Sequence, residues 1–300
     1  MQLLHSATRN YSWGSRSLIP HLQGQPDADK PVAELWFGAH PGDPSTVDGR
    51  LLNEVIAEDP AGQLGSRVSA EYGERLPFLL KVLAAEEPLS LQAHPSKAQA
   101  EEGFARENAA GIELTASNRN YKDDNHKPEL IVALTDFYAM AGFRPLARTR
   151  ELFAALECPE LDHYVAMLDD DPSATTESAN LRVLFTTWIT IPSAKRKELI
   201  SAIVAAGERL IAADPADWKS RVMSTVLDLN QRYPGDIGVL GALLLNHIEL
   251  SPGEAVYLDA GQLHAYVSGL GVEIMANSDN VLRGGLTPKF VDVPELVKVL

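Results

Sequence analysis

Cysteine and long apolar runs are the scarcest features of this sequence. Its 300 residues contain one cysteine, Cys158, which excludes an intrachain disulfide. A chain of this length can bury a core without such staples, and a lone thiol suits a reducing compartment. The most apolar run, Val239–Leu245, is far shorter than the ~18 residues of a membrane span. The N-terminus has no basic stretch followed by an apolar one, so we expect no signal peptide and a cytoplasmic location.

Basic residues are also fewer than acidic ones. The sequence has 26 Lys and Arg against 41 Asp and Glu, a formal net charge of −15 at pH 7. Such a charge disfavours nucleic acid and anionic membrane as partners. An anionic ligand would therefore need a pocket that is locally positive. Hydrophobic residues make up 45% and charged residues 22%, which is ordinary for a globular protein.

The pattern along the chain divides it into three regions. Residues 1–145 carry short apolar runs between Gly and Pro, typical of strands, with helices predicted at 53–57 and 96–108. Residues 146–233 place apolar residues three and four apart, which predicts amphipathic helices. One helix should begin at Ser193, and the Asp-Pro pairs at 171–172 and 214–215 should end helices. The strand pattern returns over 237–290, so we expect a helical insertion in a β domain.

The first candidate site is the segment Leu89–Pro95. Period-two alternation puts Ser90, Gln92 and His94 on one face of a strand. A half-exposed strand with its polar face in water explains this pattern simply. The alternative is a barrel interior, in which His94 and Gln92 bind a metal through a ring nitrogen and an amide oxygen.

The second candidate is His126-Lys-Pro-Glu129, which opens the apolar run Leu130–Leu134. Lys127 and Glu129 share a face by the same period. They could form a surface ion pair worth ~0–1 kcal/mol. They could equally be a carboxylate ligand beside an ammonium group that faces substrate.

Two later segments complete the set. The spacing from Gly253 through Asp259 and Gly261 to His264 fits strand, tight turn and strand, and it resembles the second conserved motif of cupin β-barrels. Asp259 stands where many cupins have Pro, and Ser268 where many have Asn. The segment Val272–Lys289 then contains Glu273 and a polar loop with two cations, which alone reads as solvated charge.

Taken together, the motifs indicate a protein family far more specifically than any one of them does alone. In order along the chain they are Tyr11-Ser-Trp-Gly14, Ala33-Glu-Leu-Trp36-Phe-Gly-Ala-His40-Pro, Leu91-Gln-Ala-His94-Pro, His126-Lys-Pro-Glu129, His264-Ala-Tyr266 and Ser278-Asp-Asn-Val-Leu-Arg283-Gly-Gly-Leu-Thr-Pro-Lys289. The sequence thereby resembles the type I phosphomannose isomerases. Gly284, where Ala is common, is a minor departure. A larger one is that family members continue past Thr-Pro-Lys into a further cupin-like domain, which we expect to be absent or truncated in this sequence.

The resemblance implies a mainly β fold, with a jelly-roll cupin catalytic domain formed by residues 1–145 and 234–300 and an all-α domain inserted at 146–233. It implies a metal-dependent aldose-ketose isomerase that interconverts mannose 6-phosphate and fructose 6-phosphate through a cis-enediolate. One Zn²⁺ per chain would be the cofactor, although other divalent metals suit the same donors. The expected partner is a small sugar phosphate, and the chain is expected to be a monomer. The implied metal ligands are Gln92, His94, Glu129 and His264. The implied catalytic residues are Arg283, Lys127, Glu273 and Asp279, and the implied substrate-binding residues are Ser90, Tyr266 and Lys289.

Several points stay open. The general base could be Glu273, Asp279, His264 or a metal-bound water, with Glu273 preferred because period two puts it on the inward face. The phosphate could be bound by Arg283, with Lys289 or Lys81 adding charge. His94, Glu129 and His264 would also suit an iron oxygenase, and a non-catalytic sugar-phosphate-binding cupin is a third possibility. We expect three other motif residues to be structural rather than to bind ligand, namely Trp13, Trp36 and His40.

Overall fold

The computed structural model describes residues 2–168 and 174–300. The acidic run Asp169–Asp171 and the helix end predicted at 171–172 lie outside these residues. The strands are β1 (Leu4–His5), β2 (Ala7–Arg9), β3 (Glu34–Phe37), β4 (Thr46–Val47), β5 (Arg50–Leu51), β6 (Phe78–Ala85), β7 (Leu91–Ala93), β8 (Glu129–Ala133), β9 (Phe137–Phe143), β10 (Leu245–Leu250), β11 (Ala255–Leu258), β12 (His264–Ala276) and β13 (Leu282–Gly285). The helices are α1 (Leu18–Leu22), α2 (Leu52–Glu58), α3 (Pro60–Leu64), α4 (Ser66–Tyr72), α5 (Lys97–Ala109), α6 (Leu146–Leu156), α7 (Pro159–Val165), α8 (Ala174–Ile189), α9 (Ser193–Ala213), α10 (Trp218–Arg232), α11 (Ile237–Ala242) and α12 (Val293–Val299).

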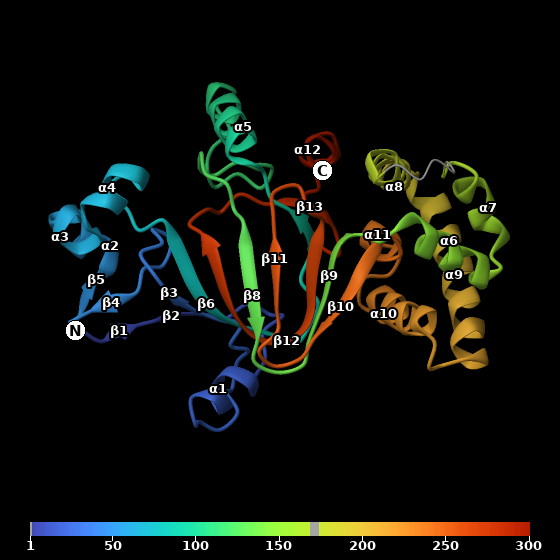
Figure 1. Ribbon diagram of the computed structural model, residues 1–300, viewed down its shortest axis with the longest axis horizontal. Coiled ribbons are helices and arrows are strands. Elements are labelled where there is room, and N and C mark those ends of the chain that lie inside the picture. The colour runs from blue at the N-terminus through green and yellow to red at the C-terminus, as the bar shows by residue number, and fades with distance from the viewer. Residues whose placement is uncertain (1, 169–173) are drawn as a thin grey trace.

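Strand β12 organises the sheets in the centre of the molecule (Figure 1). Its first part pairs with β7 and β9, and its later part pairs with β6 and β8, always antiparallel. Between the two parts lies Gly269, whose φ of +124° suits glycine. A Cβ built at this glycine would lie 2.7 Å from the carbonyl oxygen of Asp136. A glycine is therefore needed where β12 passes from one set of partners to the other.

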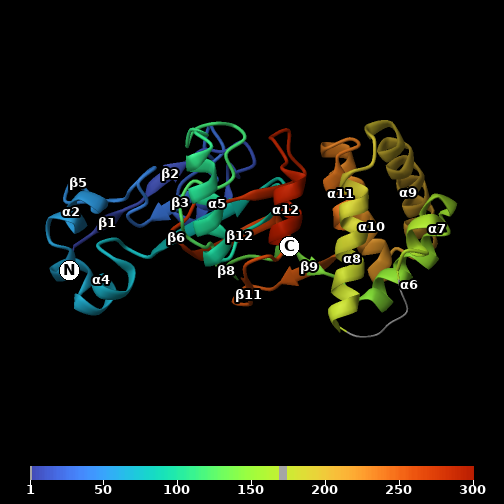
Figure 2. The ribbon, with the colours of Figure 1, turned by 90° about the horizontal axis from the view of Figure 1, so that it is seen from above.

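The helices α6 to α11 gather on one side of the sheets (Figures 1 and 2). Their apolar faces share a buried cluster with the sheet residues Leu91, Met140 and Leu282. Trp188 and Phe185, both fully buried, lie in the same cluster. Burying each large side chain contributes about 1.5–3 kcal/mol, which fixes the helices against the strands that carry the polar motifs.

Most of the predicted secondary structure is confirmed. The helix predicted at 53–57 is α2, and the one at 96–108 is α5, where Ser96 and Gln99 form a capping box. Helix α9 begins at Ser193 and ends before Asp214, as predicted. The expected fold class is confirmed in outline, since the chain is rich in sheet and most of its helical residues follow residue 145.

The prediction of strand from Ile237 onwards is wrong for its first residues. Helix α11 occupies Ile237–Ala242, and strand begins only at Leu245. Asp236 starts the helix because its side chain accepts a hydrogen bond from the Gly238 N–H at 2.7 Å. The helix is buried on every side, so it has no polar face to give a helical period.

Helix α12 is tied to α5 by polar contacts. The Glu295 carboxylate accepts hydrogen bonds from Arg106 at 2.6 Å and from the Tyr121 hydroxyl at 2.8 Å. These contacts hold the segment after Lys289 against the body of the molecule. Among the helices of the described part of the chain, none is long and apolar enough to cross a membrane.

Candidate active site

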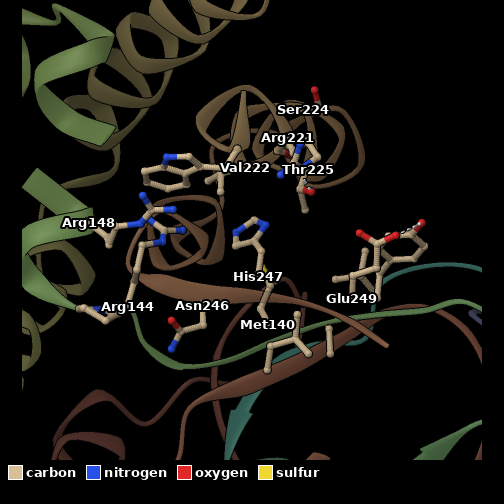
Figure 3. A pocket seen from close by; sticks show the side chains of 16 residues that line it. Met140, Arg144, Arg148, Arg221, Val222, Ser224, Thr225, Asn246, His247 and Glu249 are labelled. Atoms are coloured by element: carbon tan, nitrogen blue, oxygen red, sulfur yellow. Dashed lines mark hydrogen bonds between the residues drawn. The ribbon is translucent and has the colours of Figure 1, made fainter. Parts of the chain in front are cut away.

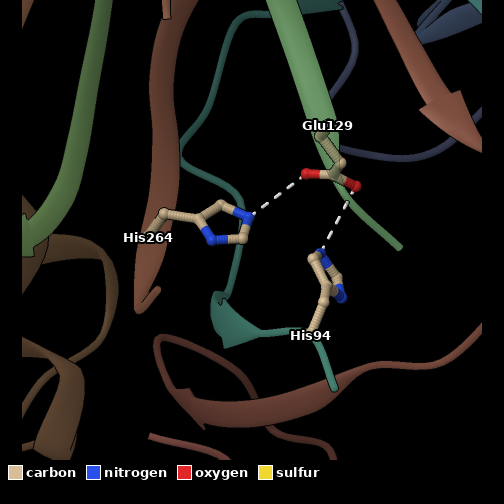
Figure 4. A group of neighbouring side chains, drawn as sticks. All are labelled: His94, Glu129 and His264. Atoms are coloured by element: carbon tan, nitrogen blue, oxygen red, sulfur yellow. Dashed lines mark ion pairs between the residues drawn. The ribbon is translucent and has the colours of Figure 1, made fainter. Parts of the chain in front are cut away.

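Three buried side chains from three separate segments meet in one cluster (Figure 4). His94 follows β7, Glu129 begins β8 and His264 begins β12. The Nε2 atoms of His94 and His264 lie 3.3 Å from the Oε1 and Oε2 atoms of Glu129, respectively. All three potential ligand atoms lie within 4.8 Å of one another. Segments up to 170 positions apart in the sequence thus supply one group that could hold a metal ion.

Backbone carbonyls orient both imidazole rings. The Nδ1 atom of His94 lies 2.8 Å from the Asn280 carbonyl oxygen, and Nδ1 of His264 lies 2.8 Å from that of Gln262. A carbonyl only accepts, so each Nδ1 carries the proton and each Nε2 presents its lone pair to the cluster. This arrangement is the usual outer support of a histidine that binds metal.

The atoms that face one another have no hydrogen-bond partners. His94 Nε2, His264 Nε2 and Glu129 Oε2 are buried and unsatisfied. An unpaired buried polar atom costs ~1–3 kcal/mol, and these lie together, pointing at a common space. A bound cation would satisfy all of them. The residues present therefore fit a divalent metal on the chemistry of their donors.

Charge around the cluster favours its metal-binding form. Burial, helped by the nearby Lys127 ammonium, lowers the pKa of His94 to about 4, so its ring is neutral. Burial alone would raise the pKa of Glu129, but the charge of Lys127 opposes burial, and that pKa is held well below its ordinary value. Lys127 Nζ lies 3.0 Å from Glu129 Oε1, and the side chains are 10% and 3% exposed. The pair is buried, so its interpretation as a surface ion pair is wrong.

Strand register places Gln92 and Arg283 on the face of the sheet that carries His264. Gln92 in β7 lies directly opposite His264 in β12 and opposite Arg283 in β13. Residues directly opposite one another on antiparallel strands project on the same side of the sheet. Gln92 is thus placed beside the histidine cluster on the side that Arg283 also faces.

A cavity of about 450 Å³ opens above Glu129. Nine of the residues that sequence analysis singled out line it: Ser90, Gln92, Lys127, Glu129, Tyr266, Glu273, Asp279, Arg283 and Lys289. The remaining predicted ligands, His94 and His264, do not line the cavity themselves, but both contact Glu129, which does. The structure therefore brings all of the predicted site residues together around one space.

One wall of the cavity holds a buried network of charges. Lys81 Nζ lies 3.0 Å from Glu273 Oε2 and 3.5 Å from Glu34 Oε1, and the Tyr266 hydroxyl donates to Glu273 Oε1 at 2.9 Å. Burial raises the pKa of Glu273 even though Lys81 opposes this. Burial would lower the pKa of Lys81, but Glu273 and Glu34 raise it, so Lys81 is charged. Because two carboxylates neutralise Lys81, it is poorly suited to bind phosphate, a role left open for it from the sequence.

Two other residues that line the cavity, Arg283 and Lys289, are cationic. No ion pair involves Arg283 or Lys289 within residues 2–168 and 174–300, although both line the cavity. Burial lowers the pKa of Lys289, and the charges of Arg283 and Lys122 lower it further. Like charges held together without a counter-charge favour an anion between them. This is the local positive pocket that a chain of net charge −15 needs for an anionic ligand.

Asp279 reaches the cavity through a contact that the sequence did not predict. His40 Nε2 lies 3.4 Å from Asp279 Oδ1, and His40 Nδ1 accepts a hydrogen bond from the Gly42 N–H. The bonded Nδ1 leaves the Nε2–H directed at the carboxylate. Burial would raise the pKa of Asp279, but His40 lowers it, so the carboxylate is ionised. His40 thus has the structural role expected of it, and that role is at the cavity.

Other residues line the cavity although the sequence indicated no functional role for them. Trp13 and Trp36 pack against core clusters as expected, yet both also line the cavity. Glu34 was not singled out, although its carboxylate accepts from the Trp36 indole N–H at 2.8 Å. Period two within Glu34–Phe37 could have shown that Glu34 and Trp36 share a face. Tyr233, at the end of α10, gave no signal because nothing in the sequence places the helices beside the cavity.

Fold and site together define a class of protein: a sheet-rich protein with a two-histidine, one-carboxylate group beside a charged cavity. Comparison with known proteins narrows this class. Residues 1–146 match the family "Phosphomannose isomerase type I, catalytic domain". The chain is 41% identical to the mannose-6-phosphate isomerase of Escherichia coli K12, over 99% of this chain and 74% of that protein. It is 37% identical to the human enzyme, over 99% and 72%. The chain therefore belongs to the type I phosphomannose isomerase family, which is a family of enzymes.

Solved structures of mannose 6-phosphate isomerases support the same family assignment. A mannose 6-phosphate isomerase from Salmonella typhimurium, described as bound to its substrate and a zinc atom, superimposes with a TM-score of 0.87 at 39% identity. It is covered over 74% of its length by the whole of this chain. A mannose 6-phosphate isomerase bound with zinc and yttrium gives a TM-score of 0.86 at 40% identity, with the same coverage. The expectation of a zinc-type metal centre thus agrees with both the donor group seen here and the zinc-bound relatives.

Proposed function

We propose that this chain is a zinc-dependent aldose-ketose isomerase that interconverts mannose 6-phosphate and fructose 6-phosphate. The observation that carries the proposal is the arrangement of one cavity. Beside it lie three buried, unsatisfied metal-ligand atoms, and its lining includes two cations, Arg283 and Lys289, without carboxylate partners among the described residues. The first feature suits the carbonyl end of a sugar and the second suits its phosphate. The relatives named above support the choice of substrates.

The metal would be held by His94, Glu129 and His264, with the Gln92 amide oxygen as the fourth donor. Nitrogen and oxygen donors without thiolate suit Zn²⁺, and the single cysteine, Cys158, plays no part. When bound, the ion supplies Lewis-acid polarisation of the sugar oxygens. The chain contributes the orientation of the two rings through the carbonyls of Asn280 and Gln262.

Substrate orientation would come from Arg283 and Lys289. Lys289 would bind the phosphate as a point charge. Arg283 lies opposite Gln92 in the strand register, and it would donate to sugar oxygens as well as reach the phosphate. Ser90 and Tyr266 line the intervening wall and would hold hydroxyl groups by hydrogen bonds.

The isomerisation is a proton transfer that needs no oxidant or reductant. A base removes the proton from C2 of the open-chain aldose, the C2–H electron pair forms a C1=C2 double bond, and the π pair of the C1 carbonyl moves onto O1, which gives a cis-enediolate. A proton then returns to C1, and C2 becomes the carbonyl carbon as its hydroxyl loses a proton. Glu273 is the proposed base because burial raises its pKa and brings it nearer the working pH. Tyr266 and Lys81 hold its two oxygens.

Charge that develops on the sugar oxygens would be stabilised by Lys127 and Arg283, each worth ~3–4 kcal/mol when well placed. Asp279, held ionised by His40, is a further proton acceptor at the cavity rim. These roles follow from where the charges lie, since Lys127 contacts Glu129 at the metal group and Arg283 faces the same space.

We also propose the finer architecture. The two sets of strands that share β12 would form a jelly-roll cupin barrel from residues 1–145 and 234–300, and residues 146–233 would be an inserted all-α domain. The pairing of β12 with four other strands supports a closed sheet around the cavity. Monomeric state and cytoplasmic location stay predictions, and light scattering on the purified chain measures the former.

A coupled assay tests the activity. The zinc-loaded chain should convert mannose 6-phosphate to fructose 6-phosphate, lose this activity to a chelator and regain it on addition of zinc. In D₂O, the product should carry deuterium at C1, as an enediolate requires when its proton exchanges with solvent. Zinc-loaded chain that binds the sugar phosphate without converting it would favour a binding protein, and oxygen consumption with bound iron would favour an oxygenase.

A further inference from the structure

A second cavity lies on the other side of the sheet from the candidate active site. It has a volume of about 630 Å³ and is bounded by β9, β10, α6 and α10 (Figure 3). Tyr266 lines the first cavity, whereas its neighbour in β12, Val267, lines the second. The two cavities share no lining residue, so this part of β12 lies between them. We call the second space the far-side cavity.

Two arginines stand together at one end of the far-side cavity. The guanidinium carbons of Arg144 and Arg148 lie 5.6 and 4.0 Å from the ring centroid of Trp218. Arg144 is buried and donates to the Leu243 and Leu245 carbonyl oxygens, and within the described residues it has no carboxylate partner. Burial, and then the charge of Arg148, lowers the pKa of Arg144 to about 10. In the same part of the chain, Arg148 forms an ion pair with the exposed Glu151, 3.3 Å away. The two arginines repel, and an anion between them would relieve that repulsion.

A hydrogen-bond acceptor faces the middle of the same cavity. His247 Nε2 lies 3.0 Å from the Ala242 carbonyl oxygen, so Nε2 carries the proton. Burial lowers the pKa of His247 to about 4, which keeps the ring neutral. Its Nδ1 atom is therefore an acceptor, and no described residue donates to it. Figure 3 shows the ring projecting from β10 toward α10, between the arginine pair and Thr225.

About half of the remaining lining is apolar, and the rest includes a third cation, Arg221, which donates to the Ala216 carbonyl oxygen. Met140, Val222, Ile248 and Val267 line the space, with the indole of Trp218 beside the arginines. The carboxylate at the far end, Glu249, accepts from the Tyr138 hydroxyl at 3.2 Å and would repel a second negative group. The walls therefore suit a flat or ring-shaped body that carries a single anionic group.

We infer that the far-side cavity is a second ligand site, which takes a small organic anion. The anionic group would lie between Arg144 and Arg148, a ring would pack on the apolar wall, and an N–H or O–H of the ligand would donate to His247 Nδ1. This inference does not depend on the isomerase activity, because the metal group and the far-side cavity share no lining residue.

The test uses 8-anilinonaphthalene-1-sulfonate as the probe, since it joins a sulfonate to an aromatic body with one N–H. Its fluorescence would be titrated into the full chain and into Arg148→Gln, Thr225→Trp and the control Arg209→Gln. Arg209 is a matched arginine on α9 that lies outside the cavity lining. The Thr225→Trp side chain would fill the space opposite His247, and Arg148→Gln changes a side chain that is 51% exposed.

We expect one probe molecule per chain whose dissociation constant rises at least tenfold in Arg148→Gln and whose binding is lost in Thr225→Trp. Binding to Arg209→Gln should match that of the unmodified chain, and saturating mannose 6-phosphate should not displace the probe. Equal binding by all variants, absence of binding, or displacement by the sugar phosphate would each overturn the inference. The variant comparisons need no substrate, so they remain decisive even if the proposed isomerase activity is not found.

Discussion

Replacing Glu129 by Gln gives a perturbation with two separable effects. The substitution keeps the shape of the side chain and removes its charge. Lys127 Nζ, 3.0 Å away and 10% exposed, would then be buried without a counter-charge. Breaking a buried pair from one side costs about 3–5 kcal/mol. For a domain of this size, the metal-free protein should melt lower by on the order of 10 °C.

The same substitution should weaken zinc binding. Apparent binding free energies for zinc in small sites of about 10–16 kcal/mol, divided over four donors, give roughly 3 kcal/mol for each. A loss of this size corresponds to about a hundredfold in the dissociation constant. Zinc should therefore raise the melting temperature of Glu129→Gln less than that of the unmodified chain, because stabilisation by a ligand depends on its concentration relative to its dissociation constant.

Thermal melts with chelator and with added zinc measure both effects. The control is Glu101→Gln, since Glu101 is 57% exposed and its pair with Lys97 on α5 is worth under ~1 kcal/mol. We expect the control to behave as the unmodified chain does. An unchanged melting temperature of metal-free Glu129→Gln, together with a full response to zinc, would refute the assignment of Glu129 to both the buried pair and the metal.

Three further predictions concern charge and pH. Arg283→Gln should retain one zinc and lose roughly 10²–10³ in kcat, because a donor to developing charge is removed. Metal analysis and steady-state kinetics measure the two effects, and loss of the zinc or an unchanged kcat would contradict the prediction. Lys289→Gln should raise KM about tenfold with a smaller change in kcat, since a charged hydrogen bond to phosphate is worth ~1.5–3 kcal/mol, and an unchanged KM would remove Lys289 from the phosphate site. The pKa of His247 in the folded chain is lowered to about 4, below its value in the unfolded chain, so the unfolded state binds more protons. The free energy of unfolding should therefore decrease as the pH is lowered below about 6.5. Because the ring is partly exposed to the far-side cavity, the loss at pH 5 should be at most about 2 kcal/mol, and urea unfolding of His247→Gln should lack that part of the acid loss.

The sequence predicted which residues would lie around one cavity, and their roles stay predictions. Period-two alternation placed Lys127 with Glu129 and kept Gln92 on a polar face, because adjacent side chains of a strand must alternate. The meeting of His94, Glu129 and His264 was expected from the family motifs. Spacing alone could not give it, since pairing between β7, β8 and β12 is a long-range property.

What the sequence did not predict has a physical cause in each case. Helix α11 resembles a strand in the sequence because it is buried on every side, and its only local helix signal is the N-cap residue Asp236. The part that Lys81 plays in the wall depends on its register with Glu273 and Glu34 on neighbouring strands. The far-side cavity depends on how α10 packs beside β10, which no local pattern reports.

The metal group is the central claim, and zinc-edge X-ray absorption on the zinc-loaded chain tests it most directly. With one zinc per chain, the account predicts scattering from two imidazoles at ~2.0–2.1 Å together with oxygen donors and no sulfur. A spectrum without imidazole scattering, or with a Zn–S shell at ~2.3 Å, would contradict it.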